Sequence, residues 1–105
     1  MSELASRTCA GTARTALNAD QIQEMLKQVS GWEVVDGHHL FRHFGFDDFV
    51  SALAFTNRAG DVAEELGHHP NIHLTWGKVE IEIYTHDVNG LSECDFILAA
   101  RLDGL

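Results

Sequence analysis

Apolar residues recur along the chain with two different periods, and the change from one period to the other marks the expected elements. Three segments carry an apolar residue at every third or fourth position, as helices with one buried face do. Four shorter segments alternate apolar and polar residues, which is typical of strands. We therefore expect helices over about 18–30, 48–67 and 92–99, and strands over Trp32–Asp36, His38–Phe46, Ile72–Trp76 and Val79–Thr85.

Capping residues and glycines bound these segments. Asn18 and Ser92 each stand three residues before a side chain that can complete a capping box. Gly67 is placed to end the long helix, and Gly37 and Gly77 to turn the two hairpins. The order is then helix, hairpin, helix, hairpin, helix. It predicts an α+β fold, a four-stranded antiparallel sheet with three helices packed on one face.

Length and composition fit one globular domain. The 105 residues are 45% hydrophobic and 22% charged, which leaves no room for a second domain and no sign of low complexity. Residues 1–16 are small, polar and aperiodic, so we expect a flexible N-terminal arm followed by a single domain over 17–105. Cys9 and Cys94 have no zinc or redox spacing, so we expect reduced cysteines in a cytoplasmic protein.

Charge and hydropathy exclude several classes of partner. The formal net charge is −9, which disfavours nucleic acid and anionic membrane surfaces. No apolar run approaches the roughly 20 residues of a membrane span, and Met1–Ser30 lacks the apolar run of a secretory signal. An open sheet has two unpaired edges, so we expect at least a homodimer.

The histidines are the residues that indicate most directly where a functional site could lie. Of seven histidines, His68 and His69 directly follow the expected end of the long helix, and His86 ends the last strand. These three imidazoles could meet at one rim of the sheet. Because imidazole titrates near neutral pH, such a group suits a reaction that delivers one proton and removes another, for example a dehydration. His38 and His39 lie beside a hairpin turn and are interpreted as solvated.

Other kinds of site have weaker support. His69 and His73 have the i, i+4 spacing that binds zinc on a helix, but Pro70 argues against a continuous helix there, so we expect no metal. Cys94 has no obvious base near it and is interpreted as a buried small hydrophobe. Trp76, near a turn, could equally pack in the interior or form the wall of a pocket for a flat ligand.

The stretch Glu64–Asp95 resembles the signature of the pterin-4a-carbinolamine dehydratases. That signature has an acidic residue, His-His-Pro, an aromatic residue, a histidine and an aspartate at set spacings. The matching residues here are Glu64, His68, His69, Pro70, Trp76, His86 and Asp95. The segment THDVNGLSECDFILA is also similar to the family's sequence. The resemblance covers about residues 17–103 and implies the same order of helices and strands.

The resemblance implies an activity, the loss of water from 4a-hydroxytetrahydropterin to give quinonoid dihydropterin in tetrahydrobiopterin recycling. His68 and His86 would be the acid/base pair, and His69 would hold the pterin. The implied supporting or substrate-contacting residues are Glu64, Pro70, Trp76 and Asp95. Some members have an aromatic residue soon after His-His-Pro, where this chain has Asn71 and Ile72, so the pocket wall there is less aromatic.

The resemblance also bears on partners. It implies a homodimer or homotetramer that needs neither metal nor cofactor and that serves an aromatic amino acid hydroxylase. Relatives with this fold also act as dimerisation partners of transcription factors or as assembly helpers. A non-catalytic binding or assembly protein is therefore the alternative. The intact set of three histidines favours catalysis, since a scaffold has no need of it.

Overall fold

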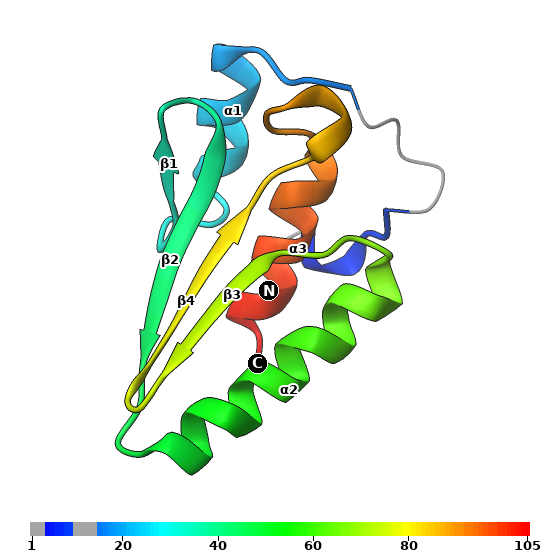
Figure 1. Cartoon of the computed structure of the whole chain (residues 1–105). Helices are drawn as coiled ribbons and strands as arrows, with labels where there is room; N and C mark the ends of the chain where they lie inside the picture. Colours follow the sequence, from blue (N-terminus) through cyan, green and yellow to red (C-terminus); the bar gives the residue numbers. More distant parts are fainter. Residues whose placement is uncertain (1–3, 10–14) are drawn as a thin grey trace.

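The computed structural model describes residues 4–9 and 15–105, and over these residues the predicted element order and fold class are confirmed (Figure 1). Four strands of this part form an antiparallel sheet in the order β1-β2-β4-β3. Their bounds are β1 Glu33–Val35, β2 His39–Gly45, β3 Asn71–Thr75 and β4 Lys78–Ile83. The two hairpins meet along β2 and β4, where Leu40 pairs with Ile83 and Phe44 with Val79.

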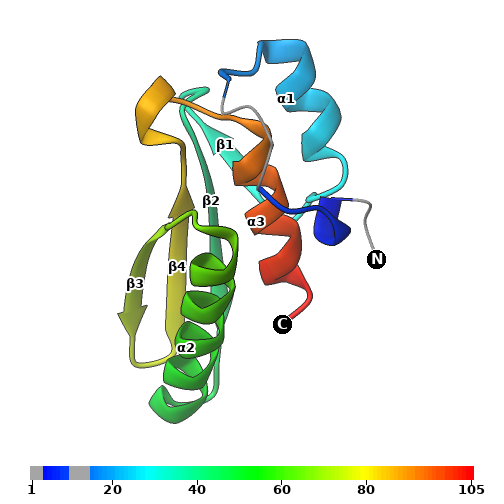
Figure 2. The same cartoon turned by 90° about the vertical axis from the view of Figure 1, so that its right-hand side faces the viewer.

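The α-helices of the described chain lie on one face of this sheet (Figure 2). They are α1 Ala19–Leu26, α2 Phe49–Leu66 and α3 Glu93–Asp103. Phe96 and Ile97 of α3 have no exposed surface, and neither have Val79, Ile81 and Ile83 of β4, which belong to the same apolar cluster. The core therefore lies between the central strands and α3. None of the described helices is both long and apolar enough to cross a bilayer.

Aromatic side chains hold the first hairpin to the helices. The ring centroids of Phe44 and Phe46 lie 4.6 and 5.2 Å from that of Phe55 on α2. Trp32 is 3% exposed and donates its indole N–H over 2.8 Å to Asp103 at the end of α3. Trp32 therefore packs beneath the hairpin.

Several element boundaries differ from the sequence prediction by one to four residues, and α3 continues to Asp103. α1 ends at Leu26, several residues earlier than expected, and turns carry the chain on to β1. β4 ends at Ile83 because Thr85 pairs instead with Gly90, closing a loop in which His86–Val88 form a short 3-10 helix, η2. This loop, rather than a strand end, carries His86.

The described part of the N-terminal segment packs on α3. Leu4–Ser6 form a 3-10 turn, η1, and Leu4 is 1% exposed. Residues 4–9 are thus docked on α3, where the sequence predicted a flexible arm; the arm's residues 1–3 and 10–14 lie outside the described residues. Cys9 and Cys94 form a disulfide, so the expectation of reduced cysteines is wrong for this structure. The packing of η1 brings together two residues that are 85 positions apart, which no local spacing rule could reveal.

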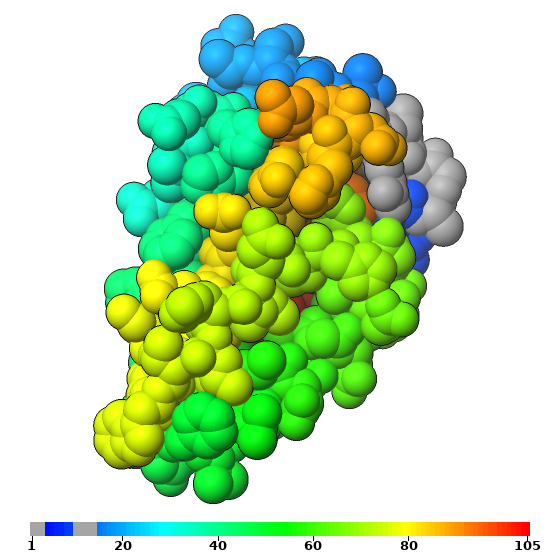
Figure 3. Space-filling model, viewed as in Figure 1, coloured from blue at the N-terminus to red at the C-terminus, as the bar shows by residue number. Residues whose placement is uncertain are grey.

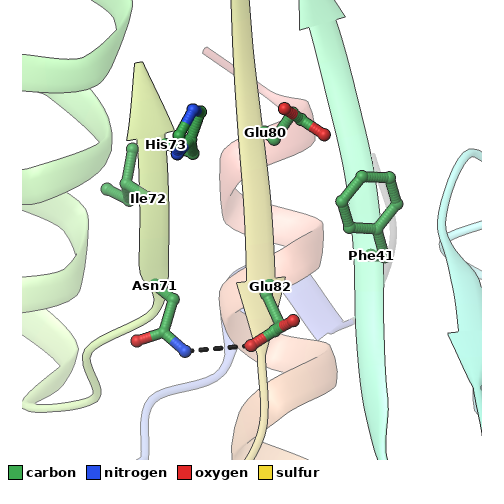
Figure 4. Close-up of a pocket in the computed structure, with 6 residues that line it drawn as sticks. All are labelled: Phe41, Asn71, Ile72, His73, Glu80 and Glu82. Carbon is green, nitrogen blue, oxygen red and sulfur yellow. Dashed lines mark hydrogen bonds between the residues drawn. The ribbon is translucent and has the colours of Figure 1, made fainter.

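The opposite face of the sheet is polar, and none of the described helices covers it. Figure 4 shows Phe41, His73, Glu80 and Glu82 around a shallow hollow of about 350 Å³ on this face. Asn71 donates its side-chain N–H to Glu82 over 3.0 Å (Figure 4). The strands thus alternate as predicted, with apolar residues toward the helices and polar residues outward.

Candidate active site

The end of α2 sends His68 and His69 in different directions. Gly67 has a φ of 66°, its N–H donates to the Glu64 carbonyl over 3.2 Å, and the His68 N–H donates to the Ala63 carbonyl over 3.1 Å. This pair of hydrogen bonds is a Schellman motif, in which one left-handed residue reverses the chain at the helix end. His68 consequently turns into the molecule and is 5% exposed, whereas His69 stays exposed.

A buried carboxylate holds His68. The Nε2 atom of His68 lies 2.5 Å from Oδ1 of Asp95, which is in the first turn of α3 and has no exposed surface. The other oxygen, Oδ2, accepts the Thr85 hydroxyl and the Ser92 backbone N–H, each over 2.8 Å. All three contacts set a possible donor against a carboxylate oxygen, and a carboxylate has only acceptor sites. The hydrogen in the contact with His68 therefore belongs to Nε2 of the imidazole.

Hydroxyl groups extend this network away from the imidazole. The Thr85 hydroxyl has one hydrogen, which it donates to Asp95, so in its 2.7 Å contact with the Ser92 hydroxyl it is the acceptor. The Ser92 hydroxyl in turn accepts the Asp95 backbone N–H, which makes the predicted capping box of α3. The same residues that start α3 therefore fix the orientation of the Asp95 carboxylate.

His69 has a different carboxylate partner. Its Nε2 is hydrogen-bonded to Oε2 of Glu64, one turn back on the outer surface of α2. Both side chains are exposed, so water screens the contact and it contributes little to stability. Glu64 therefore lies beside His69, and Asp95 beside His68.

His86 borders the same hollow as the two helix-end histidines. It is an exposed residue that begins η2. The hollow has a volume of about 190 Å³ and is lined by Gly67, His68, His69, Thr85, His86 and Asp87. In the space-filling view the orange-yellow chain around η2 adjoins the yellow-green chain that follows α2 (Figure 3). The three histidines singled out by the sequence thus lie around one hollow.

Trp76 lies away from this hollow. It is 68% exposed in the turn between β3 and β4, and it is not among the residues that line the hollow. Extended chain advances about 3.3 Å per residue, so β3 carries Trp76 roughly 20 Å from Pro70. Pro70 is half-buried between His69 and β3 and does not line the hollow either. Trp76 is therefore neither a core residue nor a wall of the hollow in this structure.

Metal-ligating side chains do not gather here. Over residues 4–9 and 15–105, no group of three or more His, Cys, Asp or Glu side chains is arranged to hold a metal ion. His69 precedes an extended strand, so its spacing to His73 is not that of a helix. The two histidines consequently do not share a helix face.

The structure adds residues that the sequence analysis did not place at the site. Thr85 and Ser92 complete the hydrogen bonding of Asp95. The sequence held a signal for each, because Thr85 begins the segment THDVNGLSECDFILA that is similar to the family's sequence and Ser92 begins the predicted capping box. Tyr84 stacks on His86 with ring centroids 4.4 Å apart. His38, interpreted as solvated, is half-buried against Tyr84. The contact between His38 and Tyr84 joins the two hairpins, so no local pattern predicts it.

The chain is also similar to a known protein family. Residues 15–105 match the family model described as pterin 4 alpha carbinolamine dehydratase. A curated relative from Rubrobacter xylanophilus is 46% identical over 100% of both chains, and one from Alkaliphilus metalliredigens is 42% identical over 98% of this chain and 96% of its own. Both are provisionally named pterin-4-alpha-carbinolamine dehydratases.

Solved structures show the same fold. A transcriptional coactivator/pterin dehydratase from Brucella melitensis has a TM-score of 0.81 at 33% identity, covering 86% of this chain and 97% of that one. A pterin dehydratase-like protein identified as a RuBisCO assembly factor of the alpha-carboxysome has a TM-score of 0.62 at 29% identity, covering 70% and 87%. The family match and the full-length relatives together lead to one conclusion: this chain belongs to the pterin 4 alpha carbinolamine dehydratase family.

Proposed function

We propose that the protein removes water from a 4a-hydroxytetrahydropterin to give quinonoid dihydropterin, with His68 and His86 as the acid/base pair. The observation that carries the proposal is that His68, held by the buried Asp95, lines the same hollow as His86. A dehydration needs one proton delivered to the departing hydroxyl and one taken from the ring, and two imidazoles can do both near neutral pH.

The surroundings of each imidazole support a division of roles. Asp95 stabilises a positive charge on His68, so His68 suits the step in which an imidazole gains a proton, the removal of the ring N–H. His86 is exposed at the rim of the hollow, so it suits protonation of the 4a-hydroxyl, which then leaves as water as the C4a–O bond breaks. The lone pair of the ring nitrogen assists this departure, and His69 orients the pterin from the third side of the hollow. No metal or cofactor is needed for these steps.

Single and double histidine variants test this assignment. General acid–base groups contribute about 10²–10⁴-fold, so His68→Ala and His86→Ala should each lower kcat for carbinolamine dehydration by about 10²-fold, and the double variant should lose nearly all activity. His73→Ala, which changes an exposed histidine on the open sheet face, is the matched control and should keep the wild-type rate. Wild-type kcat in the double variant, with circular dichroism showing an intact fold, would overturn the proposal.

The alternative is a non-catalytic binding or assembly protein of the same fold. The RuBisCO assembly factor among the structural relatives favours it, as do the exposed apolar side chains Phe49, Val50 and Leu53 on α2. The ordered hydrogen bonding from Ser92 through Thr85 and Asp95 to His68 supports catalysis, because an assembly surface does not require an oriented imidazole. The dehydration assay on the wild-type protein separates the two functions.

Three finer expectations belong to this proposal. We propose that the protein works as a homodimer or homotetramer, that it is cytoplasmic, and that it serves an aromatic amino acid hydroxylase whose 4a-hydroxylated product is its substrate. Light scattering at micromolar concentration tests the first, since a particle of single-chain mass would contradict it. A reducing cytoplasm would keep Cys9 and Cys94 as thiols, so mass spectrometry of protein trapped with an alkylating reagent in cells tests the second.

A further inference from the structure

Three rings, those of His86, Tyr84 and His38, form a stack. The Tyr84 ring is 4.4 Å from the His86 ring, centroid to centroid, with 31° between the planes. The His38 ring is 4.5 Å from the Tyr84 ring, with 42° between the planes. Tyr84 therefore contacts two imidazoles, one from the loop after β4 and one from the turn between β1 and β2.

Hydrogen bonds anchor the outer member of the stack. His38 Nε2 lies 2.9 Å from Oδ1 of Asn89, and because an amide oxygen only accepts, the imidazole donates. Asn89 ends η2 in a left-handed conformation with a φ of 48°, and its N–H donates to the His86 carbonyl over 3.1 Å. His38 thus contacts the loop at the residue that closes the turn begun by His86.

The first hairpin turn places His38 at this position. Asp36 and Gly37 both have positive φ, 56° and 64°, and the His38 N–H donates to the Val35 carbonyl over 2.9 Å. Two left-handed residues between paired strands form a type I′ turn, which matches the twist of the strands and has little freedom. The turn is therefore a fixed support, from which His38 reaches the loop.

We propose that Tyr84 and His38 are positioning residues that hold the His86 imidazole toward the hollow. This proposal depends on the proposed function at one point, which is that His86 takes part in the dehydration. His86 is exposed on a loop, so without the stack its ring is free to rotate away from the hollow. A reacting group that is misplaced by a small distance loses rate without losing the fold. Tyr84 does this through its ring face, so its hydroxyl is not required.

A matched pair of variants at one position tests the role of the ring. Tyr84→Phe keeps the ring and should keep the wild-type kcat, whereas Tyr84→Leu removes it and should lower kcat by about 3- to 10-fold, the range expected for one aromatic pair. KM should change little in both variants, because Tyr84 does not line the hollow. His38→Leu should lower kcat in the same direction. Phe41→Leu, an aromatic on the same sheet face away from His86, is the control and should leave kcat unchanged.

Proton NMR supplies a readout that does not depend on activity. The ring protons of His86, assigned by their loss in His86→Ala, should be shifted by the ring current of Tyr84 in the wild type and in Tyr84→Phe, and should move toward free-imidazole positions in Tyr84→Leu. Unmoved His86 resonances in Tyr84→Leu would overturn the stack. Moved resonances with wild-type kcat would overturn the positioning role. If the wild type shows the ring-current shift but no dehydration, the proposed function fails while the ring stack stands.

Discussion

Asp95 is the residue whose surroundings constrain the chemistry most tightly. It has no exposed surface, and its carboxylate receives donors from His68, Thr85 and Ser92. Burial of a charge is costly unless hydrogen bonds compensate, and here three of them do. The same contacts orient the His68 ring, so fold stability and site geometry depend on one side chain.

Asp95→Asn should therefore damage both stability and rate. An amide presents one acceptor and one donor group, so at least one of the three donors would face an N–H. We expect the free energy of unfolding to fall by about 1–3 kcal/mol, as for an unsatisfied buried group, and kcat to fall by on the order of 10²-fold. Urea denaturation and the dehydration assay measure the two effects. Asp87→Asn, at an exposed residue of the same hollow, should change neither by a comparable amount, and an unchanged kcat in Asp95→Asn would remove Asp95 from the mechanism.

At the scale of single elements, the two ends of α2 serve different purposes. Asp48 begins the helix by accepting the Ser51 backbone N–H over 2.7 Å. Gly67 ends it in a left-handed conformation and turns His68 inward. The N-terminal cap therefore affects stability alone, while the C-terminal glycine also determines where the site begins.

Glycine-to-alanine changes within α2 should have opposite signs. A Cβ at Gly67 would meet no atom within 4 Å, so the cost of Gly67→Ala is that of a left-handed alanine, about 1–2 kcal/mol. Gly60 also has no atom within 4 Å of a Cβ but lies inside the helix, so Gly60→Ala should raise the free energy of unfolding by about 0.5–1 kcal/mol. Urea denaturation compares the two. Equal effects in the two variants would show that backbone conformation is not the cause.

The cap at Asp48 should make stability depend on pH in the acid range. Hydrogen bonds from the side chain and backbone of Ser51 hold the pKa of Asp48 below its ordinary value of 3.8. A carboxyl with a lowered pKa in the folded state stabilises the fold above its unfolded-state pKa, and this contribution is lost as the pH falls through the folded-state pKa. Asn caps a helix about as well without titrating, so Asp48→Asn should match the wild-type Tm near neutral pH and lose less Tm between about pH 5 and about pH 2. Parallel Tm curves over that range would contradict the assignment.

At the scale of the whole molecule, the docking of the N-terminal segment on α3 joins residues that lie far apart in the sequence. The Cys9–Cys94 disulfide closes 85 positions of chain, and it is accompanied by the buried Leu4 and by an ion pair of Arg7 with Glu93. A cross-link of this kind restricts the unfolded chain, and the restriction increases with the length closed. Cys94, the residue of α3 that forms the disulfide, directly precedes Asp95 in the sequence.

Cys9→Ser should therefore lower stability without altering the chemistry. Loss of the cross-link should reduce the free energy of unfolding by about 2–4 kcal/mol under oxidising conditions, and kcat should stay near the wild-type value because Cys9 is not among the residues that line the hollow. Reduction of the wild type with dithiothreitol should bring its urea midpoint to that of the variant. Midpoints that differ after reduction would mean that the serine, rather than the missing bond, causes the change.

Local chemistry in the sequence was sufficient for the elements and for much of the site. Periodicity identified the strands and helices, the capping box at Ser92 and Asp95 is present, and Gly67 ends α2 as expected. Such signals are readable because they act between residues only a few positions apart. The spacing of His68, His69 and His86 also led to the family, which the full-length relatives confirm.

Tertiary structure alone decided the contacts between distant segments. It paired Cys9 with Cys94, assigned Asp95 to His68, and brought His38 against Tyr84 behind His86. Each of these depends on how the two hairpins and α3 pack, which is determined by burial of apolar surface summed over the whole core. This total burial cannot be worked out from any one stretch of sequence. A local pattern can therefore identify the residues of a site without showing which of them are in contact.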